Sequence, residues 1–420
     1  MKIEKVLAAP GLTGFYFDDQ RAIKEGAVAD GAAYRGRPLT PGFSEVRQRG
    51  ESLSIILLLS SGELACGDCA AVQYSGADGR DPLFLARDFA PLVEGYLAER
   101  LTGLEIGSFR PLAEKFDDLP GPEGKRLHTA LRYGLSQALL QAAALKDQRL
   151  MCEVIAEEYD LPLLLEPVPI FSQSGDARYD HADRAIIKRV DVLPHGLINH
   201  VSSKLGSQGE KLLEYVTWLR RRITELGGAD YRPILHIDVY GTLGLAFRDD
   251  LERISAYLVC LEKAADPLKL RLEGPVDSGS KESQIETLAR LREMVARRGS
   301  KVEIVADEWC NTLEDVRDFV DAGAADMIQV KTPDLGSLHN SVEAVLYARE
   351  HGTGAYLGGT CNETDLSARA CVHVALAARP DQMLAKPGMG VDEGLMIVSN
   401  EMQRSLRLLK HKLDRKQVWG

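Results

Sequence analysis

Eight short apolar segments between residues 163 and 389 constrain the fold more than any other feature of this chain. They occupy residues 163–171, 185–192, 234–241, 268–275, 302–309, 326–333, 354–360 and 382–389. Most are separated by stretches of helical periodicity, as at residues 209–227, 283–298, 312–323 and 340–350. Because alternating strands and helices pair in parallel through right-handed crossovers, this part of the chain is predicted to be α/β. Eight units favour a closed TIM-type (β/α)8 barrel, with an open parallel sheet as the alternative.

The residues before this region have a mixed, α+β character. Residues 52–59 and 63–69 predict a hairpin about the turn at residues 60–62, and residues 126–158 have the spacing of one or more helices. Residues 72–81 are small, polar and rich in glycine, which is typical of a mobile loop that covers a neighbouring site.

A chain of 420 residues accommodates two or three domains. The change of pattern near residue 160 predicts two: an α+β domain at residues 1–160 and a barrel domain at residues 161–420. Residues 392–413 are expected to form a last helix that packs back on the barrel or on the first domain.

Charge and composition exclude several classes of function. The chain has 51 Lys and Arg against 62 Asp and Glu, and its net charge of −11 opposes binding to nucleic acid. Its longest apolar run, residues 55–59, is far below the roughly 20 residues of a membrane helix, and we expect no signal peptide. The seven cysteines are too scattered for a disulfide framework, and Cys66 and Cys69 lack the further ligands of a zinc site. These features predict a cytoplasmic protein with a small-molecule partner.

Three acidic residues occupy equivalent places in successive strand–helix units. Asp238, Glu273 and Asp307 each lie near the end of an expected strand and are separated by 35 and 34 residues. Because successive acids are one strand–helix unit apart, all three are expected at the same rim of a barrel, where catalytic residues are usually found. Clustered carboxylates repel one another unless a cation neutralises them, and oxygen ligands favour Mg²⁺, with Mn²⁺ as a substitute. The alternative is that each acid caps a helix or forms an ion pair.

The neighbouring units offer groups that handle protons. Gln329 and Lys331 are two residues apart, so their side chains share the face that points into the barrel mouth. A cation beside Lys331 is expected to lower its pKa and make it a base, while the alternative role is an ion pair with the acids. His195 follows the second strand and is expected across the barrel from Lys331.

The seventh segment ends in Gly358, Gly359, Thr360 and Cys361, before a helical pattern. Small residues at a helix start leave backbone N–H groups open to an anion, and a substrate carboxylate is the natural guest. The pattern does not match a dinucleotide-binding fingerprint, because its first glycine residues precede the strand instead of following it.

Together these features resemble the enolase superfamily. Within it, seven strings resemble the methylaspartate ammonia-lyase family over essentially the whole chain. These strings are GLTGFYFDDQRAI, CAAVQYSGADGRDPLF, HIDVYGTLG, VADEWCNT, QVKTPDLG, GGTCNET and AKPGMGVDEG. The Lys-x-Lys of several other superfamily branches is absent at residues 187–189, which disfavours racemases and cycloisomerases.

The resemblance implies an activity, a fold and a site. Members of that family are carbon–nitrogen lyases that split L-threo-3-methylaspartate, an amino diacid, into mesaconate and ammonia, using Mg²⁺ and a monovalent activator such as K⁺. The fold implied is an enolase-like barrel with an α+β capping domain, assembled as a homodimer. The metal ligands implied are Asp238, Glu273 and Asp307, and the catalytic residues are Lys331, which takes the C3 proton, and His195 on the opposite face. The substrate contacts implied are Gln73, Gln173, His195, Gln329, Thr360 and Cys361.

Two other functions fit the same residues. One is a dehydratase of the enolase superfamily, which removes the same kind of proton but eliminates water from an acid sugar or another carboxylate. The other is a barrel that binds a metal and a carboxylate without turning it over. Lys331 and His195 argue against the second function, since a pure binding protein needs no base.

Overall fold

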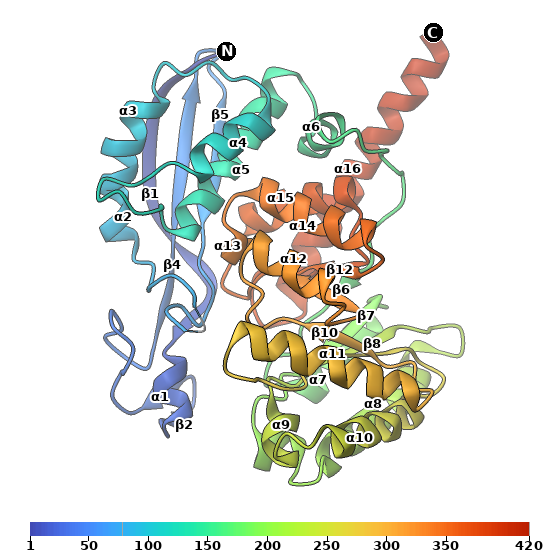
Figure 1. Ribbon diagram of the computed structural model, residues 1–420. Helices are drawn as coiled ribbons and strands as arrows, with labels where there is room; N and C mark the ends of the chain where they lie inside the picture. Colours follow the sequence, from blue (N-terminus) through green and yellow to red (C-terminus); the bar gives the residue numbers. More distant parts are fainter. Residues whose placement is uncertain (78, 420) are drawn as a thin grey trace.

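The computed structural model describes residues 1–77 and 79–419, with side chains as far as residue 414. Its larger part is a closed barrel of parallel strands in the order β10-β11-β12-β13-β6-β7-β8-β9 (Figure 1). The strands are β6 (Ile170–Phe171), β7 (Val192–His195), β8 (Ile234–Asp238), β9 (Leu270–Glu273), β10 (Glu303–Ala306), β11 (Met327–Val330), β12 (Gly354–Leu357) and β13 (Gln382–Leu384). The predicted closed barrel is confirmed, and the open sheet is excluded.

Most residues of these strands are buried on both faces, which is why the segments are continuous apolar runs in the sequence. A small apolar cluster inside the barrel consists of Phe171, Val192, Val305, Met327, Tyr356 and Leu384. The helices that follow the strands include α7 (Arg178–Ile187), α8 (Glu210–Gly227), α10 (Leu251–Ala265), α11 (Lys281–Arg297), α12 (Leu313–Asp321), α14 (Leu338–Glu350) and α15 (Asp365–Ala378). Shorter helices lie in the loops: η2 (Val201–Leu205), α9 (Thr242–Phe247) and α13 (Thr332–Leu335).

Two predicted strands are largely wrong. Of residues 163–171 only Ile170 and Phe171 form a strand, because Pro167 and Pro169 have no backbone N–H to donate to a neighbouring strand. Residues 185–192 were expected to be extended, but Ala185 and Ile186 belong to α7 and the strand begins at Val192. Both residues are buried together with Ala182, three or four positions earlier, which is the spacing of a helix face. A short apolar run cannot be assigned to helix or strand by periodicity alone, and here the helical packing decides.

The first part of the chain forms an antiparallel sheet covered by helices. Its strands are β1 (Ile3–Asp18), β4 (Arg47–Leu59) and β5 (Leu64–Cys69), and a smaller sheet contains β2 (Val28–Asp30) and β3 (Ala33–Arg35). The helices are α1 (Gln20–Lys24), α2 (Ala86–Leu92), η1 (Val93–Leu97), α3 (Ala98–Leu101), α4 (Phe109–Asp117), α5 (Thr129–Lys146) and α6 (Met151–Glu158). The predicted hairpin is present, with Leu58 paired to Leu64 across the turn.

Two glycines let helix α5 lie directly on strand β5. A Cβ atom on Gly67 would lie 2.0 Å from the carbonyl oxygen of Gly134, and one on Gly134 would lie 2.6 Å from the amide nitrogen of Cys69. Any side chain at either position would push the helix away from the strand. This close packing sets the position of α5, which also contacts the short helix α13 directly after Lys331.

The chain ends in the long helix α16 (Asp392–Trp419), which packs on α15 and then projects from the body of the molecule (Figure 1). The predicted last helix is confirmed and is longer than expected. Within residues 1–77 and 79–419, no helix is long and apolar enough to cross a membrane.

Candidate active site

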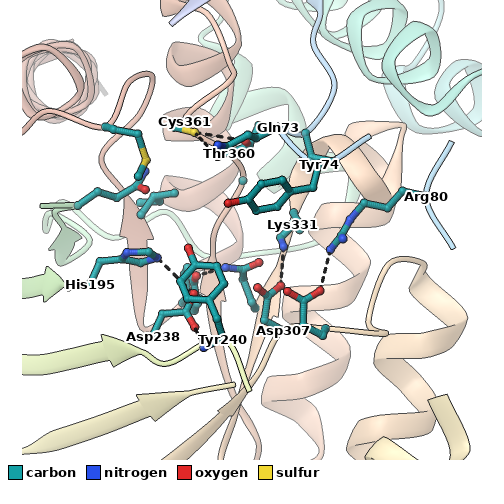
Figure 2. Close-up of a pocket in the computed structure, with 18 residues that line it drawn as sticks. Gln73, Tyr74, Arg80, His195, Asp238, Tyr240, Asp307, Lys331, Thr360 and Cys361 are labelled. Carbon is teal, nitrogen blue, oxygen red and sulfur yellow. Dashed lines mark hydrogen bonds and ion pairs between the residues drawn. The ribbon is translucent and has the colours of Figure 1, made fainter. Parts of the chain in front are cut away.

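A cavity lies where the carboxyl ends of the barrel strands meet the first domain (Figure 2). Its lining residues are Val72, Gln73, Tyr74, Arg80, Gln173, His195, Asp238, Tyr240, Asp307, Glu308, Gln329, Lys331, Tyr356, Gly359, Thr360, Cys361, Leu384 and Met389. The first domain contributes the first four, and the barrel contributes the rest. The carboxyl ends of the strands are where barrel enzymes bind their substrates.

The three acids expected to bind a metal lie together. Asp238 and Glu273 are the last residues of β8 and β9, and Asp307 follows β10. All three are buried, and one oxygen from each lies within 4.8 Å of the others. Burial and the neighbouring acids raise the pKa of Glu273 far above its ordinary value, and burial raises that of Asp307 to about 6. The three buried carboxylates repel one another, and a hard divalent cation held by their oxygens would offset that repulsion.

A chain of hydrogen bonds inside the barrel ends at the carboxylate of Glu273. Arg271 donates to Gln382, which donates to Nδ1 of His236 at 2.8 Å. Nε2 of His236 therefore carries the proton and donates to Glu273 at 2.8 Å. Burial lowers the pKa of His236 well below its ordinary value, so the ring is neutral. Tyr356 also donates to Glu273, and these partners fix the direction of its carboxylate.

Lys331 directly follows β11 and lies on the same side of the cavity as Asp307 (Figure 2). Its Nζ is 2.6 Å from Oδ1 of Asp307. Burial alone would lower the pKa of Lys331, but the Asp307 carboxylate raises it above its ordinary value. The lowered pKa was expected only beside a bound cation, so it stays a prediction. The ion pair with an acid, which was the alternative, is present.

His195 is the last residue of β7, four strands away from β11 around the barrel. It lies across the cavity from Lys331 (Figure 2), and its Nε2 is 3.4 Å from Oδ2 of Asp238. Its backbone φ of 67° is in the left-handed region, which is costly for a residue with a side chain and is typical of functional sites. The two groups expected to handle protons thus face one cavity from opposite sides.

Three glutamines predicted to contact substrate also line the cavity. Gln329 donates to Glu273 at 2.8 Å, and Gln73 donates to Asp18 at 2.6 Å. Within the described part of the chain, Oε1 of Gln329, Nε2 of Gln173 and Nδ1 of His195 are buried without a hydrogen-bond partner. Buried polar atoms are nearly always paired, so three unpaired ones around one cavity indicate a polar ligand.

Thr360 and Cys361 lie in the turn after β12, beside Gln73 of the first domain (Figure 2). The Cys361 thiol donates to Oε1 of Gln73 at 3.4 Å, and burial raises the pKa of this thiol to about 12, so it is neutral. A helical pattern was expected directly after this turn, and helix α15 follows it, beginning at Asp365. The helix begins slightly later than expected because the side chain of Thr364 caps it.

The sequence analysis missed several lining residues. Tyr240 and Glu308 follow metal-cluster acids by two and one residues, and this proximity is a signal that could have found them. Arg80 lies in the predicted loop at residues 72–81 and reaches into the barrel, 3.2 Å from Glu308 and 2.8 Å from Asp334. No pattern in the sequence indicated that pairing, because it joins residues more than 200 positions apart.

Family models account for nearly the whole chain. The methylaspartate ammonia-lyase N-terminus model matches residues 1–160, and the C-terminus model matches residues 162–411. The chain belongs to the methylaspartate ammonia-lyase family. The family resemblance noted in the sequence is thereby confirmed, as is the prediction of a carbon–nitrogen lyase.

Individual members of the methylaspartate ammonia-lyase family are similar over their full length. Methylaspartate ammonia-lyase 2 of Carboxydothermus hydrogenoformans is 63% identical, covering 98% of this chain and 99% of its own. The crystal structure of the Citrobacter amalonaticus enzyme containing (2S,3S)-3-methylaspartic acid is 57% identical, with a TM-score of 0.96 over 98% of this chain and 100% of its own. The Mg complex of β-methylaspartase from Clostridium tetanomorphum is 55% identical, with a TM-score of 0.94 and the same coverage.

A more distant likeness concerns the fold alone. Muconate lactonizing enzyme from Pseudomonas fluorescens is 16% identical, with a TM-score of 0.59 over 89% of this chain and 84% of its own. The predicted enolase-like architecture, a barrel with a second α+β unit, is thus confirmed.

Proposed function

We propose that this protein eliminates ammonia from L-threo-3-methylaspartate, an amino diacid, to give mesaconate. The observation that carries the proposal is a cavity beside the three clustered carboxylates, two of which (Asp238 and Asp307) line it, with Lys331 and His195 on opposite sides. A proton next to a carboxylate is weakly acidic, so its removal requires both a placed base and positive charge near that carboxylate.

The proposed metal ligands are Asp238, Glu273 and Asp307, and the proposed ion is Mg²⁺. The donor set supports this assignment, because it consists of carboxylate oxygens without cysteine or a ligating histidine. When bound, the ion supplies positive charge that stabilises the substrate carboxylate as negative charge accumulates on it. Mn²⁺ as a substitute and a monovalent activator such as K⁺ are further parts of the proposal.

Lys331 is proposed to take the C3 proton of the L-threo substrate. A divalent cation on Asp307 would compete with the Lys331 ammonium for the same carboxylate, which lies 2.6 Å from Nζ. Weakening that ion pair favours the neutral amine that a base requires. The proton goes to Nζ, the C3–H electron pair forms the C2–C3 double bond, and the C2–N bond breaks with its electrons going to nitrogen. His195 faces the other side of C3, where it serves the epimer or supports the reacting carboxylate.

The remaining predicted contacts are proposed to hold the substrate. Gln173 and Gln329 present buried polar atoms without hydrogen-bond partners among the described residues, and both line the cavity. Thr360, Cys361 and Gln73 form the opposite wall, where the first domain meets the barrel. Neutral donors of this kind bind carboxylates without neutralising the base, and Gln73 helps to exclude water from the closed site.

The experiment that tests this function measures two products together. The purified protein is incubated with 3-methylaspartate and Mg²⁺, and mesaconate absorbance and ammonia are recorded in the same samples. We expect equal amounts of both, and no product after exhaustive chelation. Release of water from hydroxy acids without ammonia release would favour the dehydratase, and binding without any product would favour the non-catalytic barrel.

Assembly, location and domain boundaries complete the proposal. We infer a homodimer and a cytoplasmic location, and a division into a capping domain at residues 1–160 and a barrel domain at residues 161–420. In support of the location, all seven cysteines lie in the described residues and all are free, as expected in a reducing compartment.

A further inference from the structure

Lys386 and Glu363 form an ion pair inside the protein, away from the three clustered acids. Nζ of Lys386 lies 2.8 Å from Oε1 of Glu363, and both side chains are completely inaccessible to solvent. Lys386 follows β13, and Glu363 lies between the turn at residues 358–361 and α15. A buried ion pair is weak evidence for stability, because removing both charges from water is costly. The contacts that Lys386 and Glu363 make with their neighbours therefore indicate which segments the pair holds in place.

The remaining hydrogen bonds of Lys386 reach the two loops that carry proposed substrate-site residues. Nζ donates to the carbonyl oxygen of Gly358 at 2.8 Å, at the start of the turn. It also donates to the hydroxyl of Thr332 at 3.0 Å, and Thr332 directly follows Lys331. One ammonium group thus ties the base-bearing strand end to the turn that includes Thr360 and Cys361.

Glu363 connects the same turn to the first domain. Its Oε1 accepts the backbone N–H of Thr360 at 3.3 Å. Its Oε2 accepts the hydroxyl of Tyr133, on helix α5 of the first domain, at 2.7 Å. Its backbone oxygen accepts the N–H of Gly14, in β1, at 2.8 Å. Two elements of the first domain therefore bond to this one residue beneath the turn.

The glycine at the centre of the turn shows how closely the pair fits. Gly359 has a φ of 134°, and a Cβ atom there would lie 2.3 Å from Oε1 of Glu363 and 2.4 Å from Nζ of Lys386. The ion pair is therefore in contact with the backbone of the turn. This contact fixes the position of the turn relative to the barrel.

We propose that Lys386 and Glu363 are positioning residues for the reaction. The pair holds the turn at residues 358–361 at the correct distance from Lys331, and Tyr133 transmits the position of the first domain to that turn. The inference rests on the proposed function in one respect, namely that the turn binds a substrate carboxylate. The new element is that a buried ion pair, in contact with the backbone of the turn, determines the shape of this subsite.

The first test changes Tyr133 to Phe, which removes one hydroxyl and leaves the ion pair in place. Loss of a hydrogen bond to a carboxylate predicts a rise of about tenfold in the KM for 3-methylaspartate and in the Kd for mesaconate measured by calorimetry. The affinity for Mg²⁺ should stay at the wild-type value, because the acid cluster makes none of these contacts.

The second test is the double variant Lys386→Met and Glu363→Gln, which removes both charges together and leaves neither one buried alone. We expect a Tm near that of the wild type and a KM raised by at least about tenfold. A merely structural pair would give the opposite split, with a lower Tm and an unchanged KM. The matched control is Arg292→Met, which breaks the 2.6 Å ion pair with Asp326 below β11, at the other end of the barrel. Its KM should not change.

A KM and a mesaconate Kd within about twofold of the wild type in Tyr133→Phe would overturn the inference, whether or not the double variant folds. Wild-type KM in a folded double variant would overturn it as well. An inactive wild-type protein would instead contradict the proposed function. The two failures are therefore distinguishable.

Discussion

At the residue scale, Glu273 is the most constrained side chain of the site. Its carboxylate is completely buried, accepts hydrogen bonds from His236, Gln329 and Tyr356, and is repelled by Asp238 and Asp307. The hydrogen bonds fix its direction, and a bound cation would relieve the repulsion.

A single substitution tests this account of Glu273. Glu273→Gln keeps the size of the side chain and removes the charge, so we expect Mg²⁺ affinity to fall about 100-fold in isothermal calorimetry without substrate. The control is Glu262→Gln on the outer helix α10, where the carboxylate accepts only the backbone N–H of Lys301 among the hydrogen bonds described. Unchanged Mg²⁺ affinity in the Glu273 variant would show that the cluster is structural.

At this scale, the sequence predicted which residues form the site better than it predicted how their charges interact. Equal spacing of Asp238, Glu273 and Asp307 was enough to place them at one rim, because each strand–helix unit of a barrel advances by one step. The lowered pKa expected for Lys331 beside a cation stays a prediction, and spacing did not reveal that its ammonium lies 2.6 Å from Asp307. Positions of charges relative to each other depend on loops, which periodicity does not describe.

At the scale of elements, helix α4 joins the first domain to the barrel through Asp117. This buried carboxylate accepts a hydrogen bond from Arg132 at 2.7 Å and, across the domain boundary, from the backbone N–H of Ser337 at 3.2 Å and the amide of Asn340 at 3.1 Å. Burial alone would raise the pKa of Asp117, but Arg132 and Arg126 lower it below its ordinary value of 3.8.

Asp117→Asn should therefore lower the free energy of unfolding by about 3 kcal/mol at neutral pH, because Arg132 is left buried without its counter-charge. The lowered pKa means that the carboxylate stabilises the fold above pH 3.8 and that this contribution is lost as the pH falls through the folded-state pKa. Urea unfolding at pH 7 and near pH 3 measures both effects. A difference between wild type and variant that does not shrink at the lower pH would contradict the ion-pair account.

The contact of α5 with β5 gives a second test at this scale. Gly67→Ala places a methyl group 2.0 Å from the carbonyl oxygen of Gly134, so we expect a loss of about 1–3 kcal/mol and a lower Tm. Gly95→Ala is the matched control in the same domain, because a Cβ there meets no atom within 4 Å. Equal melting temperatures of the two variants would mean that α5 has room to move.

Most elements could be predicted from the sequence because strands and helices have different apolar periods. The exceptions have physical reasons. Residues 185–187 continue a helix, since Ala185 and Ile186 are buried at helical spacing from Ala182, whereas Ile187 is exposed. Helix α15 begins slightly later than expected after the turn at residues 358–361, because the side chain of Thr364 caps it.

At the scale of the whole molecule, the site exists only where two domains meet. The barrel supplies the acids, Lys331 and His195, whereas Gln73, Tyr74 and Arg80 enter from the loop of the first domain (Figure 2). The sequence predicted the barrel and a covering loop. It did not predict the contacts that hold the first domain against the barrel, such as those of Tyr133 and Asp117. These contacts join residues 220 or more positions apart, and no local pattern records them.

Lys331 and His195 are proposed to act on opposite faces of C3 in one metal-dependent site. The most direct measurement follows ammonia release and deuterium exchange at C3 in D2O, with L-threo- and L-erythro-3-methylaspartate, for the Mg²⁺-loaded wild type, Lys331→Ala and His195→Ala. The account predicts that Lys331→Ala loses L-threo activity by a factor on the order of 10²–10⁴, while His195→Ala retains part of it and loses exchange on the opposite face. Equal losses with both substrates in both variants would contradict the two-faced assignment.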